Sequence, residues 1–162
     1  AVDAERRGAM RAAIFAACRQ AAPVWAEADH RAVGLRDADG VTRPLADLHG
    51  RRIFAFAGIG NPAAFRATLV AHGAEVAAFR PLPDHHAYTE ADLASLACEA
   101  AGARADLAVT TLKDLVKIRR ATLDSLPLAA LEIAIDFVVG KADLEATILA
   151  AVAAHATCGA AP

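Results

Sequence analysis

From Arg52 onward, the hydrophobic and polar positions alternate between strand-like and helix-like segments. Apolar runs predict strands at 53–57, 76–79, 107–109 and 133–138. Helical spacing and capping residues predict helices at 62–72, 89–101 and 142–154, and a shorter one that begins at Thr111. This alternation predicts an α/β fold with a mostly parallel sheet and helices on both faces.

Residues 1–50 form a looser lead-in to that region. Apolar residues spaced three and four apart predict a helix at 9–20. Segments 24–27 and 32–36 are expected to pair as a small hairpin, and the Asp and Gly residues of 37–40 indicate a turn. The fold is therefore predicted as an α/β sheet region preceded by a helix and a hairpin.

Composition narrows the class of protein. A chain of 162 residues, 56% apolar and 5% aromatic, is predicted to form a single α/β domain over 1–162 with a sizeable core. The net charge of −2 argues against nucleic acid as a partner. Three widely spaced cysteines favour reduced thiols and show no metal-binding spacing. No run is long enough for a membrane span, and the missing initiator Met suggests a piece of a longer chain.

The most informative segment is the turn between the strand at 53–57 and the helix that follows. Gly58 and Gly60 allow a tight turn or a close approach to a ligand, because they lack a Cβ atom. Asn61 suits the helix cap and Pro62 the first helical position. The free amides of such a helix start can bind an anion, although the same residues also suit a purely geometric turn.

A second polar segment, Asp84-His85-His86, precedes the capping box that starts at Thr89. A histidine beside a carboxylate can act as a general acid or base, since its pKa lies near neutrality. The residues alone do not choose between the two histidines. They are equally compatible with hydrogen bonding within the loop, and no matching His or Cys spacing predicts a metal site.

The third segment runs from Thr110 to Lys117. Lys113, beside the free amides of a helix start, could meet a phosphate, whereas Thr111 and Asp114 also read as a simple capping box. Strand-to-helix loops of a parallel sheet emerge at its carboxyl edge. We therefore expect 58–61, 84–86 and 110–114 to converge there.

An alternative interpretation combines Asp37 and Asp39 with Asp84-His85-His86. Metal-dependent phosphoesterases of the DHH type carry an Asp-x-Asp loop and a DHH motif. In this chain the early pair falls at an expected hairpin tip, away from the strand ends of the sheet. The alternative is therefore the less favoured one.

Taken together, the segments FAGIGNPAAF, PDHHAY and TTLKDLVK resemble the carboxyl-terminal half of the tetraacyldisaccharide 4′-kinases, over about Arg52–Arg120. The resemblance implies transfer of the ATP γ-phosphate to the 4′-hydroxyl of a tetraacylated disaccharide 1-phosphate in lipid A biosynthesis. It implies ATP and Mg²⁺ as cofactors, a lipid substrate, and a cytoplasmic location at the inner membrane face. It also places a catalytic role on His85, the residue directly after Asp84.

The sequence departs from the family pattern in two ways. Leu112 stands where the family usually has Glu, and no Gly-x-x-x-x-Gly-Lys-Ser/Thr loop occurs in the chain. The resemblance thus implies that an amino-terminal P-loop half binds ATP and Mg²⁺ and that this chain is inactive alone. A stand-alone anion-binding or interaction module is the alternative.

The expected site is then catalytic at His85 and Asp84. Its expected substrate- or phosphate-binding residues are Gly58, Gly60, Asn61, Thr110, Thr111 and Lys113.

Overall fold

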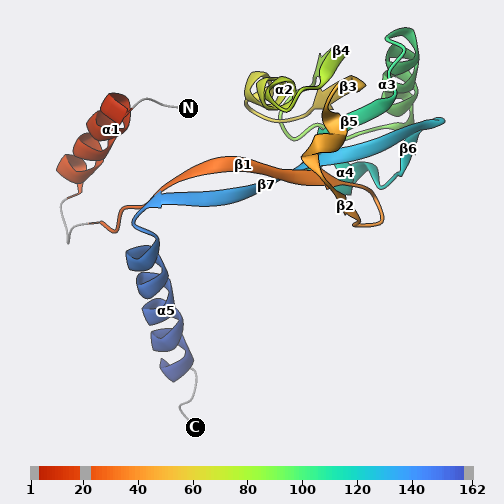
Figure 1. The fold of residues 1–162 in the computed structure, drawn as a ribbon. Coiled ribbons are helices and arrows are strands. Elements are labelled where there is room, and N and C mark those ends of the chain that lie inside the picture. The colour runs from red at the N-terminus through yellow and green to blue at the C-terminus, as the bar shows by residue number, and fades with distance from the viewer. Residues whose placement is uncertain (1–3, 19–22, 159–162) are drawn as a thin grey trace. The chain divides into compact units, whose positions relative to one another are not determined.

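The computed structural model describes residues 4–18 and 23–158. Its elements, shown in Figure 1, are α1 (Ala4–Ala17), β1 (Glu27–Arg36), β2 (Thr42–Arg43), the 3₁₀ helix η1 (Leu45–Leu48), β3 (Arg52–Ala57), α2 (Pro62–Ala71), β4 (Glu75–Pro81), α3 (Glu90–Gly102), β5 (Leu107–Thr111), α4 (Leu112–Ile118), β6 (Thr122–Leu123), β7 (Leu126–Val139) and α5 (Lys141–Cys158). The helix expected at 9–20 corresponds to α1, which begins earlier. Residues 19 and 20 lie outside the described part.

The chain divides into two compact units, one made of 1–31 and 135–162 and the other of 32–134. In the first, the Phe15 and Trp25 rings meet edge to face with centroids 6.1 Å apart. Trp25 donates a hydrogen bond to Glu27 over 3.0 Å. Within the described ranges, no helix combines the length and apolar character needed to cross a membrane. The expectation of a single domain stays a prediction.

The hairpin expected between 24–27 and 32–36 is wrong. Both 27 and 32–36 belong to the single continuous strand β1, which pairs antiparallel with β2 instead. Residues 28–31 include neither glycine nor proline, so the polar side chains there do not reverse the chain. The turn comes at Asp37, whose carboxylate accepts the N–H groups of Asp39 and Val41 over 3.1 and 2.9 Å.

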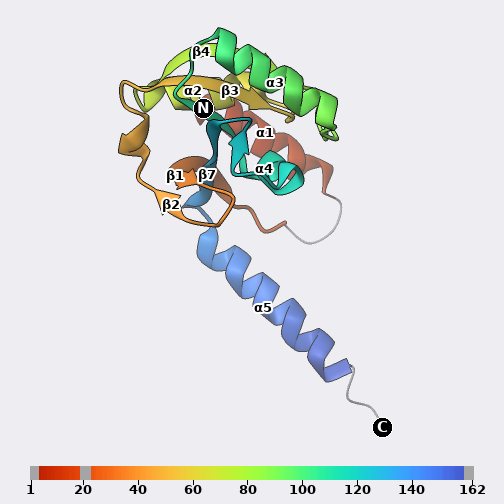
Figure 2. The same ribbon diagram turned by 90° about the vertical axis from the view of Figure 1, so that its right-hand side faces the viewer.

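The sheet has the strand order β2-β1-β7-β5-β3-β4, with β6 paired to β7. β3 pairs parallel with both β4 and β5, and β5 pairs parallel with β7, which confirms the mostly parallel sheet. β1 and β7 lie side by side in Figure 1 and Figure 2. The strand expected at 133–138 is the distal part of the longer β7, whose contact with β5 is made by 128–131.

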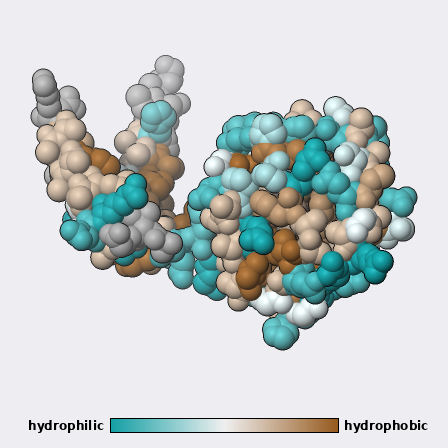
Figure 3. Space-filling model, turned by 90° about the horizontal axis from the view of Figure 1, so that it is seen from above, coloured by the Kyte–Doolittle hydropathy of each residue, from teal (hydrophilic) through white to brown (hydrophobic). Residues whose placement is uncertain are grey.

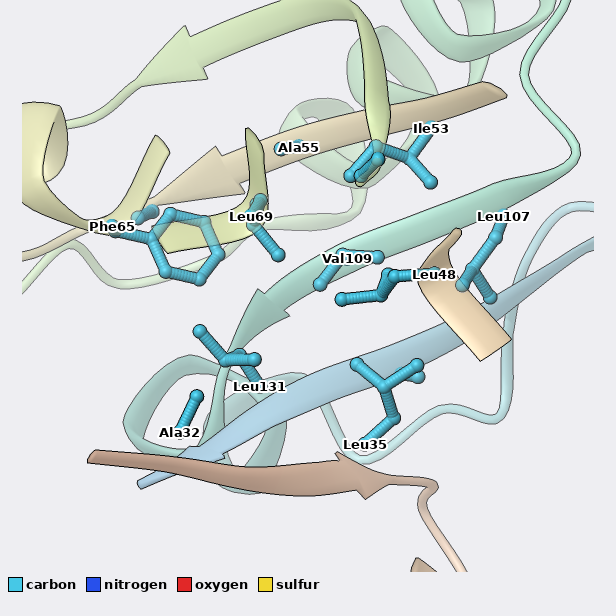
Figure 4. Packing of buried hydrophobic residues seen from close by; sticks show 13 residues of the cluster. Ala32, Leu35, Leu48, Ile53, Ala55, Phe65, Leu69, Leu107, Val109 and Leu131 are labelled. Carbon is cyan, nitrogen blue, oxygen red and sulfur yellow. The ribbon is translucent and has the colours of Figure 1, made fainter. Parts of the chain in front are cut away.

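Helices cover both faces of the sheet, as expected. On one face Ile53 and Ala55 of β3 pack with Phe65 and Leu69 of α2 (Figure 4). Phe54 and Phe56 point to the other face, where they join the buried residues of α3 and α4. This alternation follows from the two-residue period of a strand buried on both faces.

The sheet reverses its winding direction between β3 and β5. From β3 the chain continues through α2 to β4 on one side, and from β5 it continues through α4 to β7 on the other. α2 and α4 also lie on opposite faces. The carboxyl ends of these two neighbouring strands therefore mark the topological switch point, the place at which open α/β sheets commonly bind ligands.

Candidate functional site

The three polar loops converge at the carboxyl end of the parallel strands. The Gly58 N–H donates to Asp114 Oδ2 over 3.0 Å, joining the turn after β3 to α4. The Lys113 ammonium donates to Asp84 Oδ1 over 2.8 Å, joining α4 to the loop after β4. The expected convergence is confirmed, and all three loops belong to the unit formed by 32–134.

The turn after β3 is closely packed at its first glycine and open at its second. A Cβ atom on Gly58 would lie 3.2 Å from His86 Cβ and from the Pro83 carbonyl oxygen, a tighter contact than most Cβ atoms make, so the packing favours glycine there. Gly60 and Asn61 are exposed. The Asn61 side chain accepts the Ala64 N–H over 3.1 Å, which confirms it as the cap of α2.

Asp84 and His85 form the exposed part of the site. His85 has φ of +61°, a left-handed backbone conformation that is uncommon for residues other than glycine, and its side chain is 79% exposed. Its Nε2 lies 3.9 Å from Asp84 Oδ2, while Asp84 Oδ1 accepts the His85 N–H over 2.9 Å. The hydrogen bond from Lys113 lowers the pKa of Asp84. Asp84 is thus held as a carboxylate beside the His85 ring.

His86 occupies a different environment from its neighbour. Its ring meets the Tyr88 ring edge to face at 5.0 Å, and its side chain is only 21% exposed. Nε2 lies 3.3 Å from Asp92 Oδ2, close enough for an ion pair but not aligned for a hydrogen bond. The His86 carbonyl oxygen accepts a hydrogen bond from the Lys117 ammonium over 3.1 Å. His86 is built into the loop, whereas His85 projects from it.

The start of α4 contributes the third set of residues. Thr111 Oγ1 accepts the Asp114 N–H over 3.2 Å and donates to Asp114 Oδ2 over 2.8 Å, so the expected cap is present. Lys113 is exposed at the surface, whereas Thr110 is completely buried. Leu112 is half-buried and packs against the core on the α3 and α4 face.

Sequence reasoning missed Tyr88 as part of this site. Burial raises the pKa of its phenol, and the negative charge of Asp114 raises the pKa further. The Tyr88 hydroxyl is buried and has no hydrogen-bond partner among the described residues. The same holds for the Thr110 hydroxyl and for Asp114 Oδ1. A signal was available: Tyr88 is the chain's only tyrosine and stands two residues after His86.

The geometry gives the phosphoesterase alternative no support. Asp37 caps the turn between β1 and β2, where its carboxylate binds two backbone N–H groups. Among the described residues, no three His, Cys, Asp or Glu side chains cluster as metal ligands do. Among the described residues, the loop with Asp84 therefore has no second group of carboxylates beside it to help bind the metal ions that such chemistry requires.

Comparison with known proteins gives a consistent result. The family model for tetraacyldisaccharide-1-P 4′-kinase matches residues 3–153. Tetraacyldisaccharide 4′-kinases from Syntrophus aciditrophicus and Chelativorans sp. are 44% and 40% identical to this chain, over 66% and 69% of its length. The protein from Rhodospirillum centenum is 55% identical over 45% of the chain.

The chain spans only part of these relatives, namely 28%, 36% and 21% of their own lengths. A solved structure shares the fold: LpxK from Aquifex aeolicus, described as the "apo" form in complex with ATP. It matches with a TM-score of 0.50 and 23% identity, over 76% of this chain and 35% of that one. On the match across 3–153, the chain belongs to the tetraacyldisaccharide-1-P 4′-kinase family.

Proposed function

We propose that this chain is the carboxyl-terminal part of a kinase that phosphorylates the 4′-hydroxyl of a tetraacylated disaccharide 1-phosphate in lipid A biosynthesis. Family membership supports the reaction class. The observation that carries the proposal is the exposed His85 ring beside Asp84, on the loop that the Lys113 hydrogen bond joins to the start of α4. In the reaction, the hydroxyl oxygen bonds to the γ-phosphorus of ATP, ADP leaves, and the hydroxyl proton passes to a base.

ATP and Mg²⁺ are assigned to an amino-terminal P-loop half. The chain has no Gly-x-x-x-x-Gly-Lys-Ser/Thr segment, which is the loop that cradles phosphates in such kinases. Its described residues also offer no cluster of acidic side chains that fits a metal ion. Neither group therefore enters a step performed by the residues of this chain.

The helix α5 supports such a partner half. Beyond its first turns it is mostly alanine with larger apolar residues, and it has no charged face. Ile148, Leu149 and Val152 are 53%, 68% and 61% exposed, and hydrophobic residues, brown in Figure 3, remain at the surface of the chain. A helix that is apolar on all sides is normally buried by protein. We assign its cover to the P-loop half of the parent enzyme.

Within the site, each residue receives a role from its position. Asp84 orients the His85 ring, which assists attack by the sugar hydroxyl by tuning a carboxylate base from the other half. The exposed Gly60, Asn61 and Lys113 are assigned to contact with the substrate phosphate. We assign indirect roles to Gly58, Thr110 and Thr111. Gly58 and Thr110 are buried and Thr111 is half-buried, so they support the exposed residues of the site instead of contacting the substrate. We propose the cytoplasmic face of the inner membrane as the place of this work, in line with a lipid substrate.

The decisive experiment compares the two histidines in a complete parent kinase. His85→Ala should lower kcat by roughly 100- to 10,000-fold, the usual contribution of a positioned acid or base, with little change in thermal stability. His86→Ala should mainly lower Tm, because the His86 ring packs on Tyr88. Equal and small kinetic effects would remove His85 from the mechanism.

The 162-residue chain alone tests the division of labour. It should form no phosphorylated disaccharide from ATP, whereas the complete parent should, with an inactivated enzyme as the control. Product from the isolated chain would contradict the assignment of ATP binding to another half. A parent that binds anions and never phosphorylates would favour the stand-alone binding module instead.

A further inference from the structure

One buried charge at the site is not used by the proposed reaction. Asp114, on the first turn of α4, has no solvent exposure although it is flanked by the exposed Lys113. Placing a carboxylate out of water is unfavourable unless hydrogen bonds replace its hydration. Its contacts should therefore show why this position holds a carboxylate.

The hydrogen bonds of Asp114 join two elements that follow different strands. Oδ2 accepts the Gly58 N–H over 3.0 Å, from the turn after β3. The same oxygen accepts the Thr111 hydroxyl over 2.8 Å, at the end of β5. One carboxylate oxygen therefore sets the distance between the glycine turn and the start of α4.

The other carboxylate oxygen faces a buried polar cluster. Asp114 Oδ1 is 3.8 Å from the Lys117 ammonium, and the Tyr88 and Thr110 hydroxyls are buried near it. A Cβ atom on Gly58 would come within 3.3 Å of this oxygen. The carboxylate is thus enclosed on both oxygens, which leaves it little freedom to move.

From the same stretch of α4, two lysines reach the loop that carries His85. Lys113 binds the Asp84 carboxylate over 2.8 Å, directly before His85 in the chain. Lys117 binds the His86 carbonyl over 3.1 Å, directly after it. The position of α4 therefore determines the position of the loop on both sides of His85.

We propose that Asp114 is a positioning residue for the phosphoryl transfer: by fixing α4 to the glycine turn, it sets where the His85 ring stands relative to the turn at 58–61. The inference rests on the proposed function of His85. Asp114 touches neither substrate nor reacting atoms. It acts through Gly58 on one side and through Lys113 and Lys117 on the other.

A double-mutant cycle in the complete parent kinase tests this inference. Asp114→Ala should lower kcat on the order of 100-fold, the effect of a displacement of about 1 Å at a reacting group, with KM for ATP unchanged. Combined with His85→Ala, it should lower kcat hardly further, because the two residues act as one unit. Effects that multiply in the double variant would overturn the proposal.

Asp92→Ala is the matched control for the loss of a helix cap. Asp92 holds the same third position in α3 as Asp114 in α4, and each N–H donates to the capping threonine over 3.2 Å. The Asp92 carboxylate lies beside His86, but no hydrogen bond joins it to Gly58. Its removal should lower Tm and should combine multiplicatively with His85→Ala. If Asp114→Ala does not fold, Asp114→Asn replaces it. Its amide oxygen still accepts the Gly58 N–H hydrogen bond, so this variant should retain most of kcat, and a loss as large as that of His85→Ala would overturn the proposal.

Amide hydrogen exchange in the 162-residue chain provides a measurement that does not need activity. Asp114→Ala should speed exchange of the Gly58 N–H while the amides of α3 stay protected, and Asp92→Ala should leave Gly58 unchanged. Unchanged exchange at Gly58 in Asp114→Ala would overturn the proposal whatever the enzyme assay gives. A parent without kinase activity would instead refute the proposed function and leave the exchange result to stand.

Discussion

The phenol of Tyr88 allows a direct test of the buried cluster, because it should resist ionisation. Its ordinary pKa is 10.0, and burial raises the folded-state pKa above that value, with the Asp114 carboxylate as the second cause. A phenolate at this position would lose hydration and would face a like charge. We therefore expect the folded chain to keep Tyr88 protonated at a pH where the unfolded chain has ionised it.

The sign of the effect on stability follows from proton counting. Above pH 10.0 the unfolded state binds fewer protons than the folded state, so the free energy of unfolding falls as the pH rises. The steepest slope is about 1.4 kcal/mol per pH unit for one proton. Because the ring is only partly buried, solvent screening reduces the pKa shift. The slope therefore applies over a narrower pH range, which lies between the unfolded-state and folded-state pKa. Below pH 10.0 the contribution of Tyr88 is fully present.

Near-ultraviolet absorbance of the phenolate reads this group alone, because the chain has one tyrosine. The titration midpoint should lie above 10.0 in the folded chain and return toward 10.0 in denaturant, with circular dichroism as a check on folding. Asp114→Asn should lower the folded midpoint without abolishing the shift, since burial remains. The exposed Asp124 provides the control, because Asp124→Asn should leave the midpoint unchanged.

A folded chain that titrates at the ordinary pKa would refute the burial argument. An Asp114→Asn midpoint equal to that of the unmodified chain would refute the placement of the carboxylate beside the phenol. Unfolding before Tyr88 ionises would not end the test. In that case Tyr88→Phe, which keeps the ring and removes the titrating hydroxyl, should move the onset of alkaline unfolding to higher pH.

Two further predictions concern packing and are read by chemical or thermal unfolding. Gly58→Ala should destabilise the chain by about 1–3 kcal/mol, because the added methyl group would overpack against His86 and the loop, while Gly102→Ala, with nothing within 4 Å, should not. Leu69→Ala should cost about 2–5 kcal/mol, because this side chain is completely buried under the sheet. Its neighbour Val70, 49% exposed, should tolerate alanine within about 0.5 kcal/mol, and equal costs at both positions would contradict the packing.

Local patterns predicted the elements around the site because their signals lie within a few residues. The Asn61 cap with Pro62 marks the start of α2, and the box of Thr89 and Asp92 marks the start of α3; both helices begin where these residues indicate. Convergence of the loops was also predictable, since strand direction in a parallel sheet follows from the alternation of strands and helices.

The parts that were not predicted depend on distant residues. Asp114 reads from sequence as a cap partner of Thr111, and its bond to Gly58 spans 56 residues. The course of β1 was missed for a related reason. The polar residues at 29–31 suggest a turn by local composition, yet the strand continues as a neighbour of β7 in the sheet. Pairing with a distant strand overrides local propensity in such segments.

The contact between Gly58 and Asp114 also links two sequence requirements. Glycine is favoured at 58 because a Cβ atom there would come within 3.2–3.3 Å of His86, the Pro83 carbonyl oxygen and Asp114 Oδ1. An acceptor is needed at 114 because the Gly58 N–H is buried, and a buried donor without a partner is costly. Replacing Asp114 with leucine, which has a similar shape, would therefore remove the charge and leave the buried Gly58 N–H without a hydrogen-bond acceptor. The two positions therefore constrain each other: glycine at 58 leaves room for the side chain at 114, and that side chain supplies the acceptor that the buried Gly58 N–H needs.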